Sequence, residues 1–155
     1  MNIADRFTET AKNHHHKIAV KYPRRSGQHY HYDSITFGEL ESLSNQYANG
    51  LVRIGFRRGS KTLLFVRPSL KFPALVFALF KIGVVPVFID PGMGRKNLLA
   101  AIEEVSPEGL IAEPEVHLMR IMFGRSFKSV KLKVTTKGPK IKNCFPLAML
   151  EKFKA

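Results

Sequence analysis

The stretch KTLLFVRPSLKFPALVFALFKIGVVPVFID, residues 61–90, decides the fold class. It opens with a short continuous apolar run, residues 61–66, which is typical of a strand buried on both faces of a parallel sheet. A proline-containing break follows, in which Ser69 could cap the next helix. That helix should reach Ile82, and because it is apolar almost all round it should lie deep. A second apolar run, residues 84–90, predicts another buried strand, and a strand–helix–strand order requires a parallel pair.

Beyond residue 90 the chain keeps alternating between helical and strand patterns. The spacing of apolar residues predicts helices over residues 95–105 and 116–123, and strands over residues 109–113 and 129–134. Strands separated by helices lie parallel, and the crossing helices cover the faces of the sheet. We therefore predict an α/β fold with a doubly wound, mostly parallel sheet and helices on both faces.

Before residue 61 the sequence predicts a helix and then a pair of strands. Residues 3–11 have helical spacing. Residues 17–22 read as a strand that Pro23 should end, because proline lacks the N–H that a ladder needs. A polar turn follows, and residues 29–37 alternate well enough to form the partner strand.

A long helix follows the strand pair. Thr36 and Glu39 have the spacing of a capping box, in which each side chain bonds the free backbone N–H of the other residue. An apolar stripe at steps of three or four then predicts a helix of about eighteen residues with one buried face. Gly55 is its natural terminator.

Composition indicates a folded chain with a strong positive charge. The chain has 155 residues, 45% of them hydrophobic, and a formal net charge of +13 at pH 7. The single cysteine, Cys144, excludes an internal disulfide and fits a reducing compartment. The longest apolar run, residues 72–80, is far shorter than the roughly 18–20 residues that span a bilayer. We therefore expect a cytoplasmic protein without a transmembrane segment.

Residues 116–150 contain eight Lys or Arg residues and no carboxylate. Such a stretch could bind nucleic acid or an anionic membrane. In residues 129–134, however, lysines alternate with apolar residues, which is typical of a strand with one solvated face. Lysines there would also discourage edge-to-edge pairing of sheets. Because no aromatic residues interleave with these basic residues, we favour the solvated strand over nucleic-acid binding.

A glycine turn at the end of the second predicted strand is the candidate anion site. Gly92, Gly94, Arg95 and Lys96 begin a predicted helix there, and free amides at a helix start can hold an anion. The dinucleotide fingerprint needs a third glycine, but position 97 is Asn97, so the match is only partial. A turn without a ligand is therefore the favoured alternative.

Other chemistry-bearing residues are isolated. His14, His15 and His16 are adjacent, so their side chains diverge and a solvated turn is more plausible than a metal site. Cys144 and His117 have no partner nearby in sequence, which favours packed or surface roles. We predict no catalytic residue and no metal ligand in this chain.

Two segments together resemble the AMP-forming acyl-CoA synthetases and related adenylating enzymes. Residues 35–66, ITFGELESLSNQYANGLVRIGFRRGSKTLLFV, resemble the family's aromatic-x-E-L helix start, glycine and buried strand. Residues 77–91, FALFKIGVVPVFIDP, resemble its next motif, in which a helix ends in Lys-x-Gly and a strand runs into Asp-Pro. The variant DPGMGRKNLL, residues 90–99, is closest to the fatty-acid ligase branch that includes olefin β-lactone synthetases. The likeness covers residues 2–136.

The resemblance implies a two-step activity for the complete enzyme. A fatty-acid-like carboxylate attacks ATP in the presence of Mg²⁺, and a thiol or the substrate's own β-hydroxyl then displaces AMP from the acyl-adenylate. The family's phosphate loop and catalytic lysine have no counterpart in these residues. Residues 1–136 are therefore expected to be a partial N-terminal subdomain, and residues 137–155 a connector with a short helix.

We accordingly expect no cofactor for this chain alone and no activity by itself. A second polypeptide could carry the rest of the enzyme. Two other interpretations stay open at this stage: an anion-binding module built on residues 116–150, and a degraded fragment without activity.

Overall fold

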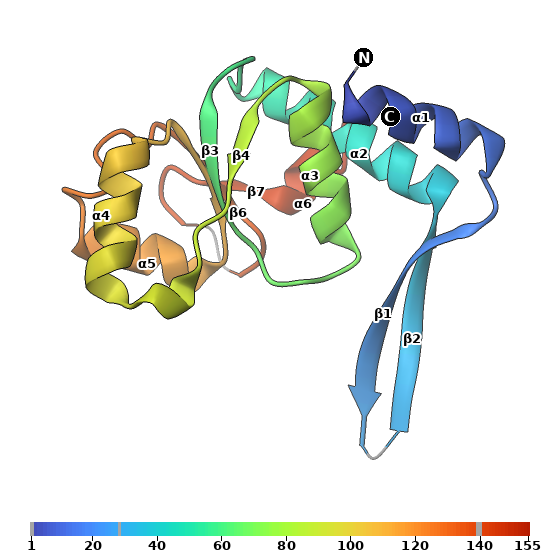
Figure 1. The fold of residues 1–155 in the computed structure, drawn as a ribbon, viewed down its shortest axis with the longest axis horizontal. Coiled ribbons are helices and arrows are strands. Elements are labelled where there is room, and N and C mark those ends of the chain that lie inside the picture. The colour runs from blue at the N-terminus through green and yellow to red at the C-terminus, as the bar shows by residue number, and fades with distance from the viewer. Residues whose placement is uncertain (1, 28, 139–140) are drawn as a thin grey trace.

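A computed structural model describes residues 2–27, 29–138 and 141–155. Its body is a five-stranded sheet in the order β4-β3-β5-β6-β7, and every neighbouring pair in it is parallel. Figure 1 shows helices packed on both sides of this sheet. The predicted α/β class is therefore confirmed. The strands are β3 (Lys61–Phe65), β4 (Val85–Val87), β5 (Gly109–Ala112), β6 (Leu132–Thr135) and β7 (Phe145–Pro146).

The helices sort into two layers because successive side chains of a strand point to opposite faces. On one face Leu64, Ile111 and Val134 pack in a common cluster with residues of α1, α2, α3 and α6. On the other face Leu63 and Leu110 pack with residues of α4. The helices are α1 (Ile3–Asn13), α2 (Phe37–Arg53), α3 (Lys71–Lys81), α4 (Arg95–Val105), α5 (Pro114–Met122), α6 (Leu147–Leu150) and the one-turn 3₁₀ helix η1 (Pro91–Met93).

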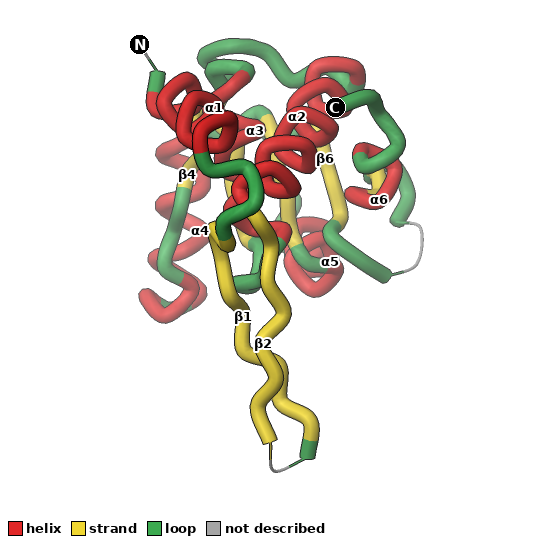
Figure 2. Tube along the Cα trace, turned by 90° about the vertical axis from the view of Figure 1, so that its right-hand side faces the viewer, coloured by secondary structure: helices red, strands yellow, loops and turns green. Residues whose placement is uncertain are grey.

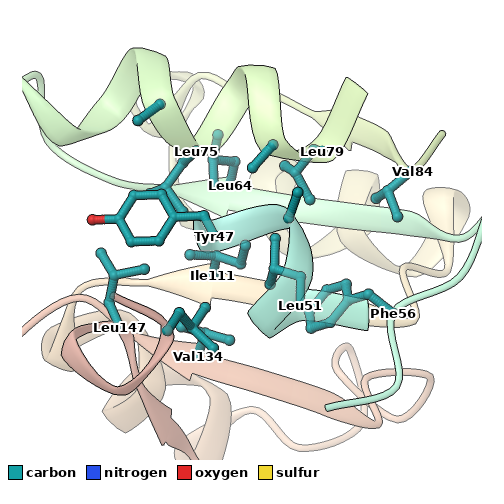
Figure 3. Close-up of a cluster of buried hydrophobic side chains, with 14 of the residues drawn as sticks. Tyr47, Leu51, Phe56, Leu64, Leu75, Leu79, Val84, Ile111, Val134 and Leu147 are labelled. Carbon is teal, nitrogen blue, oxygen red and sulfur yellow. The ribbon is translucent and has the colours of Figure 1, made fainter. Parts of the chain in front are cut away.

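The larger cluster joins the last helix to the middle of the chain. Tyr47 and Leu51 of α2 are fully buried, and Figure 3 shows Tyr47 between Leu75 of α3 and Leu147 of α6. The Tyr47 hydroxyl donates a hydrogen bond of 2.8 Å to a carboxylate oxygen of Glu151. The predicted connector therefore contributes a strand and a helix to the packed body.

Helix α2 begins with the predicted capping box and ends before the predicted glycine. Thr36 and Glu39 form the predicted box: Glu39 N donates to Thr36 Oγ1, and Thr36 N donates to Glu39 Oε2 at 2.8 Å. The hydrogen bond from the Thr36 backbone lowers the pKa of Glu39. Helix α2 ends at Arg53, and Gly55 beyond it has φ +111°, so the predicted terminator is confirmed.

Two predictions were wrong: that Pro23 ends the first strand, and that Ser69 caps the helix after residue 70. Strand β1 (Ile18–Ser26) continues through Pro23, which pairs with Tyr32 of β2 (His29–Thr36). This is tolerated because a two-stranded sheet leaves one edge of each strand open, so a residue without an N–H fits there. Ser69 makes no side-chain cap, since α3 starts after Leu70, whose backbone is already helical.

Two strands also differ from the predicted environment. The second apolar run forms β4. Among the described residues it pairs with β3 alone and leaves Val85 48% exposed, so it is a short edge strand and not a buried one. Strand β6 lies between β5 and β7, which means that Lys133 within it and Lys131 before it do not protect an edge. Helix α3 lies deep as its apolar sequence predicts: Ala74 and Leu79 are fully buried, and every residue from Phe72 to Lys81 is buried or half-buried.

The hairpin of β1 and β2 projects from the body. Figures 1 and 2 show it extending away from α1 and α2, with its tip far from the sheet. Only its root packs on the core, through Val20 and Ile35. Residues 21–26 and 29–34 are exposed on both sides.

Candidate functional site at the carboxyl ends of the strands

An apolar cavity of about 450 Å³ lies where β3, β4 and β5 end. This is the position at which open parallel sheets bind ligands, and the volume is typical of a small-molecule site. Phe72 and Phe88 provide aromatic walls, and Glu113 and Arg67 provide polar groups. The remaining lining residues are Leu64, Phe65, Val66, Pro68, Ile89, Glu115 and Val116.

Glu113 is a buried carboxylate at this edge, 8% exposed. It directly follows β5 and precedes Pro114, the first residue of α5. The backbone N–H of Arg67 donates to its Oε1 at 3.3 Å, and Lys137 Nζ lies 3.1 Å from its Oε2. Burial raises the pKa of Glu113, but Lys137, the Arg67 amide and Thr136 outweigh burial, so the pKa ends below its ordinary value. Glu113 is therefore ionised at neutral pH, and Lys137 balances its charge.

A second, more polar pocket of about 330 Å³ shares Arg67 and Glu113 with the first. Lys71 and Lys137 bring two more cations to it, and Tyr22 of the hairpin lines it as well. Each cation faces a carboxylate: Arg67 lies 3.5 Å from Glu115, Lys71 lies 2.6 Å from Glu151, and Lys137 lies 3.1 Å from Glu113. Within the described residues, the cations of this pocket are therefore already neutralised.

The predicted glycine turn lies on the surface beside the apolar cavity. Asp90 Oδ1 accepts a hydrogen bond of 2.8 Å from the Gly92 N–H, and η1 forms around it. Gly94 has φ +84° and precedes α4, whose start has no side-chain cap. The turn thus brings all four predicted residues together, but the amide of Gly92 already donates its hydrogen bond to Asp90.

Arg95, one of the two basic residues of the turn, lies near an aromatic ring. The Arg95 guanidinium lies 5.6 Å from the centre of the Phe123 ring, at the end of α5. Arg95 and Lys96 are exposed. Because an incoming anion would meet the Asp90 carboxylate, the anion site stays a prediction and the turn without a ligand stays its alternative.

Sequence reasoning missed a thiol–imidazole pair. Cys144 Sγ lies 3.6 Å from His117 Nδ1, and His117 Nε2 lies 3.1 Å from the Val134 carbonyl oxygen. Because a carbonyl only accepts, Nε2 carries the proton and Nδ1 accepts from the thiol. Burial lowers the pKa of His117 and raises the pKa of Cys144. Both groups are therefore neutral near pH 7, and the pair ties the segment before β7 to α5.

The remaining sequence candidates are the three adjacent histidines, of which His15 and His16 have their ring centres 4.9 Å apart. His14, His15 and His16 are exposed after α1, as expected for a solvated turn. No group of three or more His, Cys, Asp or Glu side chains suited to a metal ion occurs in residues 2–27, 29–138 and 141–155. Over the same residues, no helix has both the length and the apolar character needed to cross a membrane.

The residues at the strand ends were also missed, although their positions carry a signal. Arg67, Glu113 and Lys137 each follow a strand, and parallel strands bring such residues to one edge. The contacts of Glu113 with the Arg67 amide and with Lys137 join residues 46 and 24 positions apart, so they have no local signature. The predicted strands ended at residues 66, 113 and 134, so inspecting the two residues after each of them would have found only Arg67, whereas the observed strand ends place all three residues within two positions.

Comparison with known proteins identifies the family. The AMP-binding enzyme family matches residues 7–147. An olefin β-lactone synthetase of Stenotrophomonas maltophilia is 39% identical over 125 residues, which make up 78% of this chain and 23% of that protein. A second, from Xanthomonas campestris, is 36% identical over 122 residues, 77% of this chain and 22% of that protein. The chain thus spans less than a quarter of these relatives.

Solved structures show the same fold. Acetoacetyl-CoA synthetase from Streptomyces lividans superposes over 100% of this chain and 25% of its own, with a TM-score of 0.83 and 16% identity. A long-chain-fatty-acid-CoA ligase from Archaeoglobus fulgidus covers 100% of this chain and 30% of its own, with a TM-score of 0.82 and 18% identity. The chain therefore belongs to the family of AMP-binding enzymes, the adenylate-forming ligases.

Proposed function

We propose that this chain is a structural platform of an enzyme that activates a fatty-acid-like carboxylate as an acyl-adenylate, and that it has no such activity alone. The observation that supports the proposal is the apolar cavity at the carboxyl ends of the sheet, in a chain of this family. In the proposed reaction a carboxylate oxygen attacks the α-phosphorus of ATP, the bond to the β-phosphate oxygen breaks, and acyl-adenylate and pyrophosphate result.

The charges of the site explain why the platform needs a complement. Adenylation brings an anionic carboxylate against anionic phosphates, so the site must supply cations and free amides. Here each cation is held by a carboxylate: Arg67 by Glu115, Lys71 by Glu151, and Lys137 by the buried Glu113. The described residues therefore do not fit Mg²⁺ and a triphosphate, and we derive no step through either group on this chain.

The cavity suits an uncharged part of a substrate. Phe72, Phe88 and Val116 offer apolar surface. The nearby cations Arg67 and Lys137 are already paired with Glu115 and Glu113, so they do not attract a free carboxylate strongly. We infer that the reacting carboxylate and the phosphates are held by another part of the enzyme. The similarity to two olefin β-lactone synthetases favours, for the second step, attack by the substrate's own β-hydroxyl over attack by a thiol.

A chimaera tests this proposal. In the Stenotrophomonas maltophilia olefin β-lactone synthetase, the 125 matching residues are replaced by the corresponding residues of this chain. We expect carboxylate-dependent exchange of pyrophosphate into ATP by the chimaera, with the unmodified relative as the control. A chimaera that folds as cooperatively as the relative but shows no exchange would overturn the proposal.

A further inference from the structure

We propose that one face of the β1–β2 hairpin is a docking surface for the remainder of an adenylate-forming enzyme, which meets it with a carboxylate-bearing polypeptide surface. This face, here termed the outward face, consists of Lys21, Pro23, Arg25, Tyr30 and Tyr32. The inference rests on the proposed function, because it names the partner that would complete that function.

The strand register places these residues together. Directly paired residues of an antiparallel ladder point to the same face, and successive residues alternate. Pro23 pairs with Tyr32, and Arg25 pairs with Tyr30, so these four side chains share one face with Lys21. Figure 2 shows the two strands running side by side along the projecting arm.

The opposite face of the hairpin is turned toward the body at its root. Val20 and Ile35 pack on the core there, and Tyr22, on the same face, lines the polar pocket at the strand ends. This face also carries Arg24, which lies 3.9 Å from Asp33. The outward face is therefore the opposite side of the hairpin from the one that lines the candidate site.

The outward face has the composition of a binding surface. Tyr30 and Tyr32 are 63% and 64% exposed, and Lys21 and Arg25 lie beside them without a carboxylate on that face. Tyrosine and arginine are the residues that most often provide binding energy at the centre of protein interfaces. The uncompensated cations select a partner with negative charge.

The hairpin also lacks the support that would keep it stable in isolation. It is a two-stranded sheet with both faces exposed over residues 21–26, and each strand has one unpaired edge. Such hairpins are marginal in water without a packed face. A second copy of this chain would not cover it well, because Lys21 and Arg25 of one copy would repel Lys21 and Arg25 of the other.

The remainder of the enzyme is the occupant that the comparisons favour. Two solved ligases superpose over 100% of this chain, which includes the hairpin, yet the superposition takes up only 25% and 30% of their own chains. Most of each such enzyme thus lies outside the part shared with this chain. The shared part here carries a net charge of +13, so a carboxylate-bearing complement is the electrostatic match.

A two-piece assembly tests the inference. This chain is co-expressed with the Stenotrophomonas maltophilia olefin β-lactone synthetase that lacks its 125 matching residues, and the complex is measured by sedimentation velocity and by trypsin cleavage after Arg24 and Arg25. Arg25→Glu with Tyr30→Ser and Tyr32→Ser alters the outward face. Arg24→Glu with His31→Ser is the matched control on the opposite face of the same strands.

We expect a complex in which the hairpin is protected from trypsin. The outward-face variant should bind about 30-fold more weakly, the effect of losing about 2 kcal/mol at a binding hot spot, and the control variant should bind like the wild type. Thermal unfolding of each free variant confirms that both sets are folded.

Several results would overturn the inference: no complex, equal weakening by both variant sets, or an unprotected hairpin in the complex. Binding of the outward face to phosphatidylserine vesicles or to single-stranded DNA in place of the complement would also overturn it. An assembled, hairpin-dependent complex without carboxylate-dependent pyrophosphate exchange would instead count against the proposed function alone. An active complex that is indifferent to the outward-face variant would count against the docking surface alone.

Discussion

Lys81, at the end of α3, places its Nζ 2.8 Å from Glu41 Oε1 of α2. The two side chains are only 14% and 16% exposed. Asn45 Oδ1 accepts a second hydrogen bond from Lys81 at 2.6 Å, and Thr8 of α1 donates to Glu41 at 2.9 Å. The Lys81 that the sequence marks as part of a family motif thus links α3 to α2 directly and, through Glu41, to α1.

Removing one partner of this pair should be costly, because it leaves the other charge buried. We expect Lys81→Met to lower the free energy of unfolding by about 3 kcal/mol, with recovery of part of this loss in Lys81→Met/Glu41→Gln. Urea unfolding measures both. The exposed pair Arg24–Asp33, 3.9 Å apart, is the control, and Arg24→Met should cost less than about 1 kcal/mol. Equal effects at the two pairs would contradict the assignment.

Because α6 packs closely on α2 at Gly50, we expect alanine at this position to lower the free energy of unfolding. A β-carbon on Gly50 would lie 2.8 Å from Leu150 Cδ2 and 3.0 Å from the Phe153 ring. Gly50→Ala should therefore destabilise the chain by about 1–2 kcal/mol, although alanine favours a helix by about 1 kcal/mol. Gly124→Ala, whose β-carbon meets only a backbone oxygen at 3.9 Å, is the matched control and should be neutral or stabilising. A tolerated Gly50→Ala in a thermal scan would mean that α6 does not pack as described.

His117 should make stability depend on pH. Burial lowers its pKa, assisted by the charges of Arg120 and Lys133, so the unfolded chain binds a proton that the folded chain does not. Its contribution is present above the ordinary pKa of about 6.5 and is lost as the pH falls through the lower folded value. The free energy of unfolding should decrease from about pH 7 to pH 5, and His117→Gln should flatten that decrease. Parallel curves for wild type and variant would show that His117 is not the group responsible.

Glu113 and Glu115 provide a paired test of the candidate site. Both face a cation, but Glu113 is buried whereas the Glu115 side chain is 65% exposed. We expect Glu113→Gln to cost about 1–3 kcal/mol, since the Arg67 amide and Lys137 lose a charged acceptor, and Glu115→Gln to cost little. Because the pKa of Glu113 is lowered, its stabilisation is present above the ordinary pKa of a glutamate and is lost on further acidification. Acid titration of unfolding free energy for both variants checks this, and indistinguishable curves would contradict it.

The sequence predicted the parts of the fold that are set locally. The capping box of Thr36 and Glu39, the alternation from residue 61 onward and the terminator Gly55 all act within a few residues. Strand β7 was missed because it is two residues long and contains Pro146, so neither length nor periodicity identifies it. It forms because β6 offers an open edge.

The candidate site was predicted less well because its contacts join distant residues. Glu113 meets Lys137 and His117 meets Cys144 only after β5 and β6 align in register. The four residues of the glycine turn, by contrast, are adjacent in sequence and were located correctly. Whether Gly92, Gly94, Arg95 and Lys96 bind an anion stays a prediction, for which phosphate-dependent chemical shifts of their amides are the direct test.

The claim that this chain is a platform without its own triphosphate site is tested most directly by exchange of labelled pyrophosphate into ATP by the purified chain alone. With Mg²⁺ and a series of fatty and β-hydroxy carboxylates, we expect no exchange above the carboxylate-free background. Exchange that rises with carboxylate concentration and copurifies with the folded 155-residue chain would contradict the account.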